Sequence, residues 1–397
     1  MLPKIHLNEQ ISTFLKERID AGDFPSAVYL VAEKGKIVYQ DALGYAVVEP
    51  DRIAAKIDTI YDLASLTKPL ITGLLAARLL EQGEIHLEEN VSRYLGAFNT
   101  ELKSEINIKH LLTHVSGLSG WIPFYLFEDR KVPEQPKNTV LRVITTDPPE
   151  KPLETSVIYS DLNFLILAFL TEQITSKTLD RLADDYFVQP LGLLRTGFNT
   201  PPNWREKTAA SEFGNYYEKQ TCTKLGYFNG DSRDWKMASE AGQDVFEYKW
   251  RDYPIWGEVH DGNAHFMGGV AGHAGLFSTA EETFKIAQQF LPNYTTLLKP
   301  ETCELFHTNF TKGMNEDRSF AFQLASTKGS TAGTKMSPES FGHNGFTGTS
   351  LWIDPVKERI FVLLTNRTHN HPLPFVNINS VRRRFHDLSI DLLDKNR

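Results

Sequence analysis

Residues 62–83, DLASLTKPLITGLLAARLLEQG, decide the fold of this chain. Apolar residues recur at positions 70, 74, 77 and 80, and Gly83 follows as a stop signal, so the segment predicts an amphipathic helix. Pro69 lacks the N–H that an interior helical residue donates, and proline is tolerated only near the first turn. We therefore expect the helix to begin close to Ser65.

Ser65 and Lys68 are three residues apart and so share one face of the predicted helix. A serine hydroxyl becomes a nucleophile when a base removes its proton, and a lysine amine is such a base when burial or nearby positive charge lowers its pKa. The helix start adds free N–H groups and a partial positive charge. Because roughly one Ser-x-x-Lys is expected by chance in a chain of this length, the pair alone is weak evidence for catalysis.

Composition places the chain among soluble globular proteins, with 397 residues of which 41% are hydrophobic and 23% charged. The net charge of −8 offers no overall basic field, so nucleic acid and an anionic membrane are not expected as partners.

The N-terminal segment lacks the apolar run of a signal peptide, and no stretch is long enough to span a bilayer. The two cysteines, Cys222 and Cys303, lack Cys-x-x-Cys spacing, so we expect free thiols and a cytoplasmic protein.

The order of strand and helix patterns predicts one domain with two lobes. A helix is expected over 8–21 and a β-hairpin over 26–46, while later strands occupy 341–355 and 358–366 before a helix from about 378. Residues 65–255 are expected to form a mostly helical lobe inserted into an α/β lobe of 1–64 with 256–397. Prolines predict an irregular segment over 121–154, and 201–256, rich in Trp and Tyr, is expected to be an elaborated loop region beside a pocket.

Three separated motifs resemble those of a known family: SLTK at 65–68, YSD at 159–161, and HNG at 343–345 running into FTGTSLWIDP. The family comprises class C serine β-lactamases, D,D-peptidases, low-molecular-weight penicillin-binding proteins and family VIII carboxylesterases. The likeness extends from about residue 8 to 390 and includes HLLTHVSGL at 110–118 and the glycine-rich stretch at 259–280. It implies an α/β fold in which helices flank an antiparallel sheet and a mostly helical lobe is inserted.

The resemblance implies a role for each motif residue. Ser65 would attack a carbonyl and form an acyl-enzyme, with Lys68 and Tyr159 sharing its proton and His343 completing the catalytic group. Residues of the second and third motifs would bind substrate: Asp161, Asn344, Gly345 and Phe346. The backbone N–H groups of Ser65 and Phe346 would hold the oxyanion, and one such donor is typically worth about 3 to 4 kcal/mol.

Two residues depart from the β-lactamase pattern. Asp161 stands where asparagine is usual, and His343 stands where many members have lysine. A lysine there offers a fixed positive charge to the carboxylate of a β-lactam, whereas histidine is largely neutral at pH 7. Asp161 adds negative charge and loses an amide donor. We therefore expect hydrolysis of a small ester, with β-lactam or D-amino-acid amide hydrolysis as the alternative.

Other polar clusters give weaker signals. The histidines at 260, 265 and 273, with Asp261, do not have the spacing of a helical metal-ligand pair, and the family chemistry needs no metal or other cofactor. Arg382 and its neighbours at 383 and 384 are expected on a helix face, although one of them could bind a substrate carboxylate.

No Gly-x-Ser-x-Gly occurs, so an α/β-hydrolase is not expected. A third reading keeps the fold as a binding module without turnover, and the oligomeric state stays open.

Overall fold

A computed structural model describes residues 9–128, 135–228 and 248–395. Its larger sheet has seven antiparallel strands in the order β3-β2-β1-β10-β9-β8-β7. The strands are β1 (Ser26–Glu33), β2 (Lys36–Val47), β3 (Ile53–Ala54), β7 (Gln323–Leu324), β8 (Phe341–Asn344), β9 (Ser350–Asp354) and β10 (Arg359–Thr365). Because β1 pairs with both β2 and β10, the two ends of the chain share one sheet.

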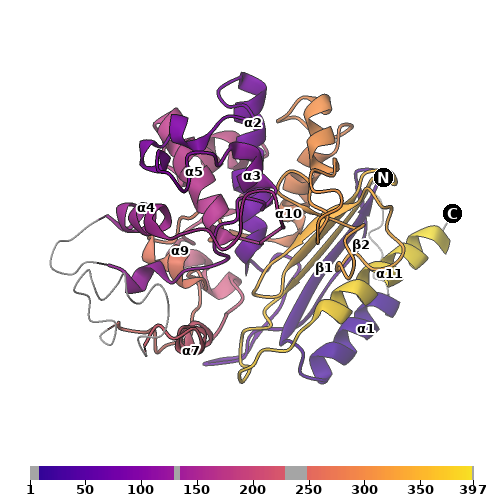
Figure 1. The fold of residues 1–397 in the computed structure, drawn as a ribbon. Coiled ribbons are helices and arrows are strands. Elements are labelled where there is room, and N and C mark those ends of the chain that lie inside the picture. The colour runs from indigo at the N-terminus through magenta and orange to yellow at the C-terminus, as the bar shows by residue number, and fades with distance from the viewer. Residues whose placement is uncertain (1–8, 129–134, 229–247, 396–397) are drawn as a thin grey trace.

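Two helices cover one face of this sheet. The N-terminal α1 (Glu9–Asp20) and the C-terminal α11 (Asn379–Lys395) lie beside each other (Figure 1). Ile11 and Leu15 of α1 and Phe385 of α11 join a buried apolar cluster with Tyr29 and Trp352 of the sheet. The alternation of side chains along β1 sends Tyr29 to this face and Leu30 to the other, where α10 (Ala280–Ala287) packs.

The remaining helices form a separate group beside the sheet (Figure 1). They include α2 (Leu74–Gln82), α3 (Ile108–Leu112), α4 (Pro136–Thr146), α5 (Asp161–Thr175), α6 (Leu179–Ala183), α7 (Tyr216–Lys224) and α9 (Gly262–Phe266). A small sheet in the order β4-β6-β5 links this group to the rest, with strands β4 (Tyr61–Asp62), β5 (Gly197–Phe198) and β6 (Leu276–Ser278). Helix α5 is almost entirely buried, as expected of a segment that is apolar on every side.

The expected fold is confirmed, and several local predictions can be compared with it. The helix expected from Ser65 to Gly83 consists of three parts: a 3₁₀ turn at Ala64–Leu66, a π-helix at Lys68–Gly73 and then α2. The irregular segment expected over 121–154 contains α4, so that prediction was wrong there; proline at the start of a helix costs no hydrogen bond. Residues 129–134 of that segment, and 229–247 of the expected loop region, lie outside the described residues. The predicted lobe boundaries stay a prediction.

None of the helices in the described ranges combines the length and apolar character that a bilayer span requires. Both cysteines are buried free thiols, as expected.

Candidate active site

Ser65 lies in the 3₁₀ turn between β4 and the π-helix. The preceding residue, Ala64, has a φ of 47°, which is unusual for a residue with a side chain. Its N–H donates to Oδ1 of Asp62 over 2.8 Å, which helps to hold this left-handed backbone. Such conformations cost about 1–3 kcal/mol and concentrate at functional sites. The strained turn presents Ser65 to a cavity, where its side chain is only partly buried.

Lys68 is fully buried at the start of the π-helix. Its Nζ lies 2.9 Å from Oγ of Ser65, 3.0 Å from the carbonyl oxygen of His273 and 2.7 Å from Oδ1 of Asp161. The predicted nucleophile and amine are therefore in direct contact. Single-turn π-helices occur frequently at functional sites, and this one begins with Pro69 at its second position, where a backbone N–H is not needed.

The glycine-rich loop before β6 supplies the carbonyl that Lys68 contacts. Thr72 donates to the carbonyl of Gly272 over 2.7 Å, which ties the π-helix to this loop. A Cβ on Gly272 would lie 2.2 Å from the carbonyl oxygen of Phe164 in α5, so only glycine lets the loop approach that helix. The sequence GGVAGHAG thus brings the backbone of His273 to the buried amine.

Tyr159 lies just before α5 and faces Lys68, whose Nζ is 5.0 Å from the centre of its ring. The ring of His114 packs on it at 4.8 Å between centroids. Nδ1 of His114 accepts the N–H of Ser160 over 3.0 Å, and Ser160 Oγ donates to the carbonyl of Ser119 over 2.7 Å. Because the loop after α3 holds the YSD segment through these bonds, the orientation of Tyr159 is fixed.

The charges around Lys68 set the proton affinities of the site. Burial lowers the pKa of Lys68, but the charges of Asp161 and Tyr159 raise it by more, so it lies above its ordinary value. Burial of the hydroxyl raises the pKa of Tyr159; Lys68 lowers it, and Asp161 raises it again, with a net increase. At neutral pH the resting site therefore holds an ammonium and a neutral phenol.

The strand motif of β8 lies opposite Tyr159. His343 is buried, and the centre of its ring is 5.6 Å from that of Tyr159. Burial and the nearby charges of Lys68 and Arg318 hold the pKa of His343 well below its usual value, so the ring is neutral, as expected. Nδ1 lies 2.9 Å from the carbonyl oxygen of Asn344, which requires it to carry the proton. The remaining lone pair on Nε2 has no hydrogen-bond partner among the described residues.

The turn between β8 and β9 is fastened to the segment that carries Ser65. Thr347 and Thr349 donate to the carbonyls of Asp62 and Leu63 over 2.8 and 3.0 Å. A Cβ on Gly345 would lie 2.0 Å from Oγ1 of Thr349 and 2.5 Å from the carbonyl oxygen of Leu63. The glycine is therefore needed for contact between two protein segments, whereas the resemblance implied only a substrate-binding role for it. This contact keeps Phe346 beside the same cavity as Ser65.

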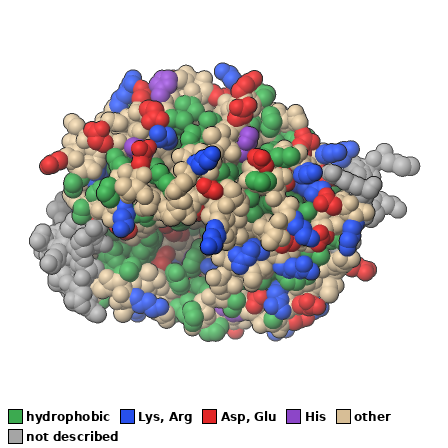
Figure 2. Space-filling model, turned by 45° about the vertical axis from the view of Figure 1, so that its right-hand side comes forward, with side chains coloured by type: hydrophobic (Ala, Val, Ile, Leu, Met, Phe, Trp, Pro, Cys, Tyr) green, Lys and Arg blue, Asp and Glu red, His purple; other side chains and the backbone are tan. Residues whose placement is uncertain are grey.

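The cavity has a volume of about 760 Å³, in the range of sites for drug-sized ligands. All eight predicted site residues except Lys68 border it, and Lys68 lies directly behind Ser65. Aromatic rings of Trp121, Tyr217 and Phe346 form part of its wall. Figure 2 shows a hollow in one face of the molecule, with acidic and basic side chains interspersed around it.

Arg367 and Arg382 also line the cavity. Arg382 is buried on α11, where its guanidinium donates to the carbonyls of Gly345 and Thr349, each over 2.9 Å. Its Nε has no hydrogen-bond partner among the described residues. The prediction that Arg382 decorates a helix surface was therefore wrong, because α11 turns this position toward the sheet; the suggestion of carboxylate binding is left open. Burial and the charge of Arg367 lower the pKa of Arg382.

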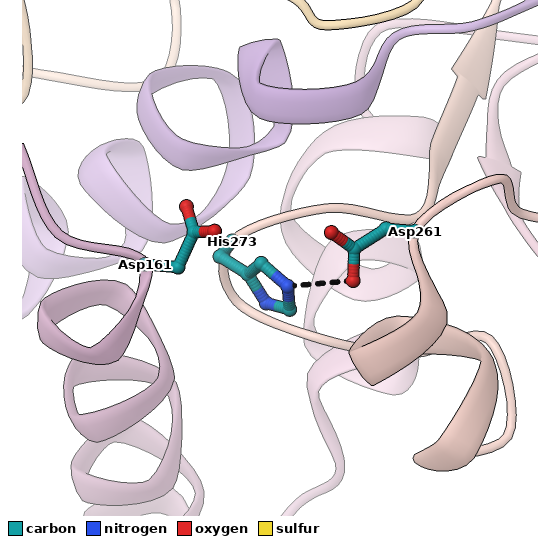
Figure 3. Close-up of side chains that lie close together, drawn as sticks. All are labelled: Asp161, Asp261 and His273. Carbon is teal, nitrogen blue, oxygen red and sulfur yellow. Dashed lines mark hydrogen bonds and ion pairs between the residues drawn. The ribbon is translucent and has the colours of Figure 1, made fainter. Parts of the chain in front are cut away.

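Three side chains form a cluster in which each offers one atom that could bind a metal ion, and these atoms lie within 4.8 Å of one another: Asp161, Asp261 and His273. Figure 3 shows the His273 ring between the two carboxylates, with Nε2 2.9 Å from Oδ1 of Asp261. Lys68 lies 2.7 Å from the other carboxylate, so the protein's own ammonium already offsets its charge. His260 pairs with Glu212, and His265 lies 3.9 Å from Glu258.

Three residues near the site had no role in the sequence analysis. His114 belongs to the HLLTHVSGL stretch, whose likeness to the family was the available signal. Arg318 packs its guanidinium 5.4 Å from the centre of the Tyr159 ring, and Arg367 lies 4.9 Å from that of Phe346. No sequence pattern marked Arg318, whereas Arg367 lies in LLTNRTHNHP at 363–372, a stretch that also resembles the family but from which no role was expected.

Comparison with known proteins identifies the family of this chain. A family model described as Beta-lactamase matches residues 11–382. A putative D-alanyl-D-alanine carboxypeptidase of Escherichia coli K12 is 30% identical over 388 residues, covering 91% of this chain and 82% of that protein. The protein of the same description from Salmonella gallinarum is 33% identical over 399 residues, covering 92% and 83%.

Solved structures share the fold at lower identity. EstCE1, a hydrolase with promiscuous acyltransferase activity, gives a TM-score of 0.69 at 20% identity, covering 95% of this chain and 97% of that one. A class C beta-lactamase from Rhodobacter sphaeroides gives 0.68 at 16%, covering 97% and 100%. The octameric penicillin-binding protein homologue from Pyrococcus abyssi gives 0.66 at 17%, covering 96% and 77%.

Proposed function

Because the chain belongs to the beta-lactamase family of serine hydrolases, we propose that it cleaves a carboxylic amide or ester through an acyl-enzyme on Ser65. The observation that carries this proposal is the contact of Lys68 Nζ with Ser65 Oγ at 2.9 Å, with Tyr159 facing the same amine. The Lys68–Tyr159 pair takes the Ser65 proton as Oγ attacks the carbonyl carbon. The same proton passes to the leaving group. Water then attacks the carbonyl carbon of the acyl-enzyme and gives a proton to the same pair, which returns it to Oγ of Ser65 as the acid is released.

The N–H groups of Ser65 and Phe346 are proposed to hold the oxyanion. Support comes from the two threonine bonds that fasten the β8–β9 turn to the Ser65 segment. Asn344, whose side chain exchanges hydrogen bonds with Thr331, and the neutral His343 border the substrate. Nε2 of His343 can accept a hydrogen bond from a substrate N–H, which an amide has and an ester lacks.

The arginines favour a substrate that carries a carboxylate. The expectation of a small ester rested on the absence of a lysine from the strand motif, but Arg367 and Arg382 bring positive charge to the same cavity. Their hydrogen bonds among the described residues go to backbone carbonyls and Asn379 rather than to carboxylates. We therefore place a D-alanyl-peptide carboxypeptidase, the reaction named for the curated relatives, first among candidate activities.

A small neutral ester is the second candidate. It is favoured by the ion pair of Asp161 with Lys68, which cancels the positive charge nearest to Ser65 and so removes one attraction for an anionic substrate. A cytoplasmic location remains part of the proposal and is compatible with the buried free thiols of Cys222 and Cys303.

A three-substrate comparison tests these candidates. The substrates are a peptide ending in D-alanyl-D-alanine, the same peptide with its C-terminus amidated, and a neutral p-nitrophenyl ester, each with the wild type and Ser65→Ala. Cleavage of the free acid at least tenfold better than the amidated peptide supports the carboxypeptidase, and that preference should fall in Arg367→Gln. Turnover of the ester alone makes the esterase primary. Activity that survives in Ser65→Ala contradicts the acyl-enzyme proposal itself.

A further inference from the structure

The carboxylate of Asp161 completes the surroundings of a buried ammonium. Lys68 Nζ donates hydrogen bonds to Oγ of Ser65 and to the carbonyl oxygen of His273, and Oδ1 of Asp161 lies 2.7 Å away as an ion pair. Two neutral acceptors and one carboxylate therefore surround the amine, and an opposite charge at this distance favours its charged form. An asparagine at position 161 would supply an oxygen but no charge, so the ion pair is a property of this chain's own residue.

We propose that Asp161 is a positioning residue that fixes Lys68 as an ammonium and thereby moves acyl transfer at Ser65 to higher pH than an uncharged residue there would allow. The inference rests on the proposed function, because it concerns the proton taken from Ser65. It goes beyond that function by giving Asp161 a role in proton transfer, in place of the substrate-binding role expected from the sequence.

The charge of Asp161 acts on both groups that can take the serine proton. It raises the pKa of Lys68 against the opposing effect of burial, and it adds to the effect of burial in raising the pKa of Tyr159. Other ionisable groups of the described residues near the amine and Tyr159 are neutral or paired. His114 and His343 are kept neutral by burial and nearby charges, Asp261 pairs with His273, and Arg318, 5.4 Å from the centre of the Tyr159 ring, pairs with Glu316 over 2.7 Å.

The proton balance follows from these protonation states. With Lys68 charged and Tyr159 neutral, the pair must lose one proton to solvent before it can accept another. The O–H bond of Ser65 then breaks, its proton moves to the pair, and the bond from Oγ to the carbonyl carbon forms. The pair returns this proton to the leaving group as that group's bond to the carbonyl carbon breaks. The acidic limb of the pH profile of kcat/KM therefore reports deprotonation of the pair as a unit.

Asp161→Asn is a suitable variant because it keeps the shape of the side chain. The backbone N–H at position 161 donates to the carbonyl of Gly120 over 2.9 Å, and this bond does not depend on the side chain. Asp180→Asn makes the same substitution in the first turn of α6, where the side chain is exposed, and is the matched control. Asp161→Glu keeps the charge and should retain most of the wild-type pH dependence.

The test is the pH profile of kcat/KM from pH 6 to 11.5 for a neutral p-nitrophenyl ester, after subtraction of the rate with Ser65→Ala; the range extends into alkali because the pKa values of Lys68 and Tyr159 both lie above their ordinary values in the wild type. An opposite charge within about 4–6 Å shifts a pKa by roughly 1–3 units. We expect the acidic limb of Asp161→Asn to lie at least one pH unit below that of the wild type, a gain of tenfold or more in the acidic range. Asp180→Asn should not move it. A limb that stays in place, or that moves to higher pH, overturns the proposal.

A second measurement does not need turnover. With ¹³C-labelled lysine, the Cε resonance of Lys68, assigned by its loss in Lys68→Met, should titrate at lower pH in Asp161→Asn than in the wild type. Equal titration in both proteins contradicts the role of Asp161. An enzyme that shows no acyl-enzyme by mass spectrometry with any substrate contradicts the proposed function instead, so the two failures are distinguishable.

Discussion

Gly345→Ala should separate the packing of the β8–β9 turn from the chemistry of Ser65. The new Cβ would lie 2.0 Å from Oγ1 of Thr349 and 2.5 Å from the carbonyl oxygen of Leu63, whereas ordinary contacts begin near 3.4 Å. The turn and the Ser65 segment must therefore separate by about 1 Å. Overpacking of this kind typically costs about 1–3 kcal/mol of stability. A 1 Å displacement of catalytic groups can lower the rate about 100-fold.

The assay combines kcat/KM with the free energy of unfolding from denaturant titration. Gly96→Ala is the control, because no atom lies within 4 Å of its added Cβ and its backbone is not left-handed. We expect Gly345→Ala to lose about 100-fold in kcat/KM, mostly in kcat, since the oxyanion donor at Phe346 moves away from the reacting carbonyl. A stable variant within threefold of wild-type activity would refute the reasoning. Lower stability with unchanged kcat would refute only the oxyanion assignment.

Three further predictions concern buried groups around the cavity. Burial and the charge of Asp261 raise the pKa of Glu218 to about 7, so the native state binds more protons than the unfolded state between about pH 4.5 and 7 and loses stability as pH rises through that window. Glu218→Gln should therefore be more stable than the wild type at pH 8, by about 1–3 kcal/mol, but not at pH 5. Urea titrations in which the two proteins show the same pH dependence would contradict this prediction. His114→Phe keeps a ring against Tyr159 but leaves the N–H of Ser160 without its acceptor. We therefore expect this variant to lose about 1–3 kcal/mol of stability and to have a lower kcat. An unchanged kcat would show that the hydrogen bond from Ser160 to His114 does not orient Tyr159. Dialysis against a chelator should leave activity unchanged, because Lys68 already offsets the charge of Asp161; loss of activity that zinc restores would instead make the cluster of Asp161, Asp261 and His273 a metal site.

Local sequence patterns predicted the parts of the fold that depend on periodicity. The hairpin of β1 and β2 was expected over 26–46, and α11 was expected as a helix from about residue 378. The contact between Ser65 and Lys68 followed from their spacing alone, because a helical turn brings residues three apart together. The meeting of the three motifs came from the family resemblance, since no local rule relates positions 65, 159 and 343.

Features set by tertiary contact could not be predicted in this way. The π-helix at Lys68–Gly73 has the same apolar spacing as an α-helix, and its wider turn fits the contact of Thr72 with the glycine-rich loop. Arg382 looked like a surface residue because it stands in a run of three arginines, and only the docking of α11 on the sheet shows which of them turns inward. Gly345 was singled out from the sequence as a substrate-binding residue, which stays a prediction, and the atoms that exclude a side chain there, from Thr349 and Leu63, become visible only in three dimensions.

The charges of the cavity divide into two groups that act on different parts of a substrate. Beside Ser65, the Lys68–Asp161 ion pair is electrically neutral, so it tunes proton transfer without strongly attracting or repelling the substrate. At α11 and the end of β10, Arg382 and Arg367 carry positive charge that no carboxylate among the described residues offsets. A bound carboxylate would also relieve the effect of burial and mutual repulsion that lowers the pKa of Arg382. The preference for a charged substrate and the pH dependence of kcat/KM should therefore respond to different substitutions. Arg367→Gln should change the preference for a free carboxylate and leave the acidic limb of the pH profile in place. Asp161→Asn should move that limb for neutral and anionic substrates alike.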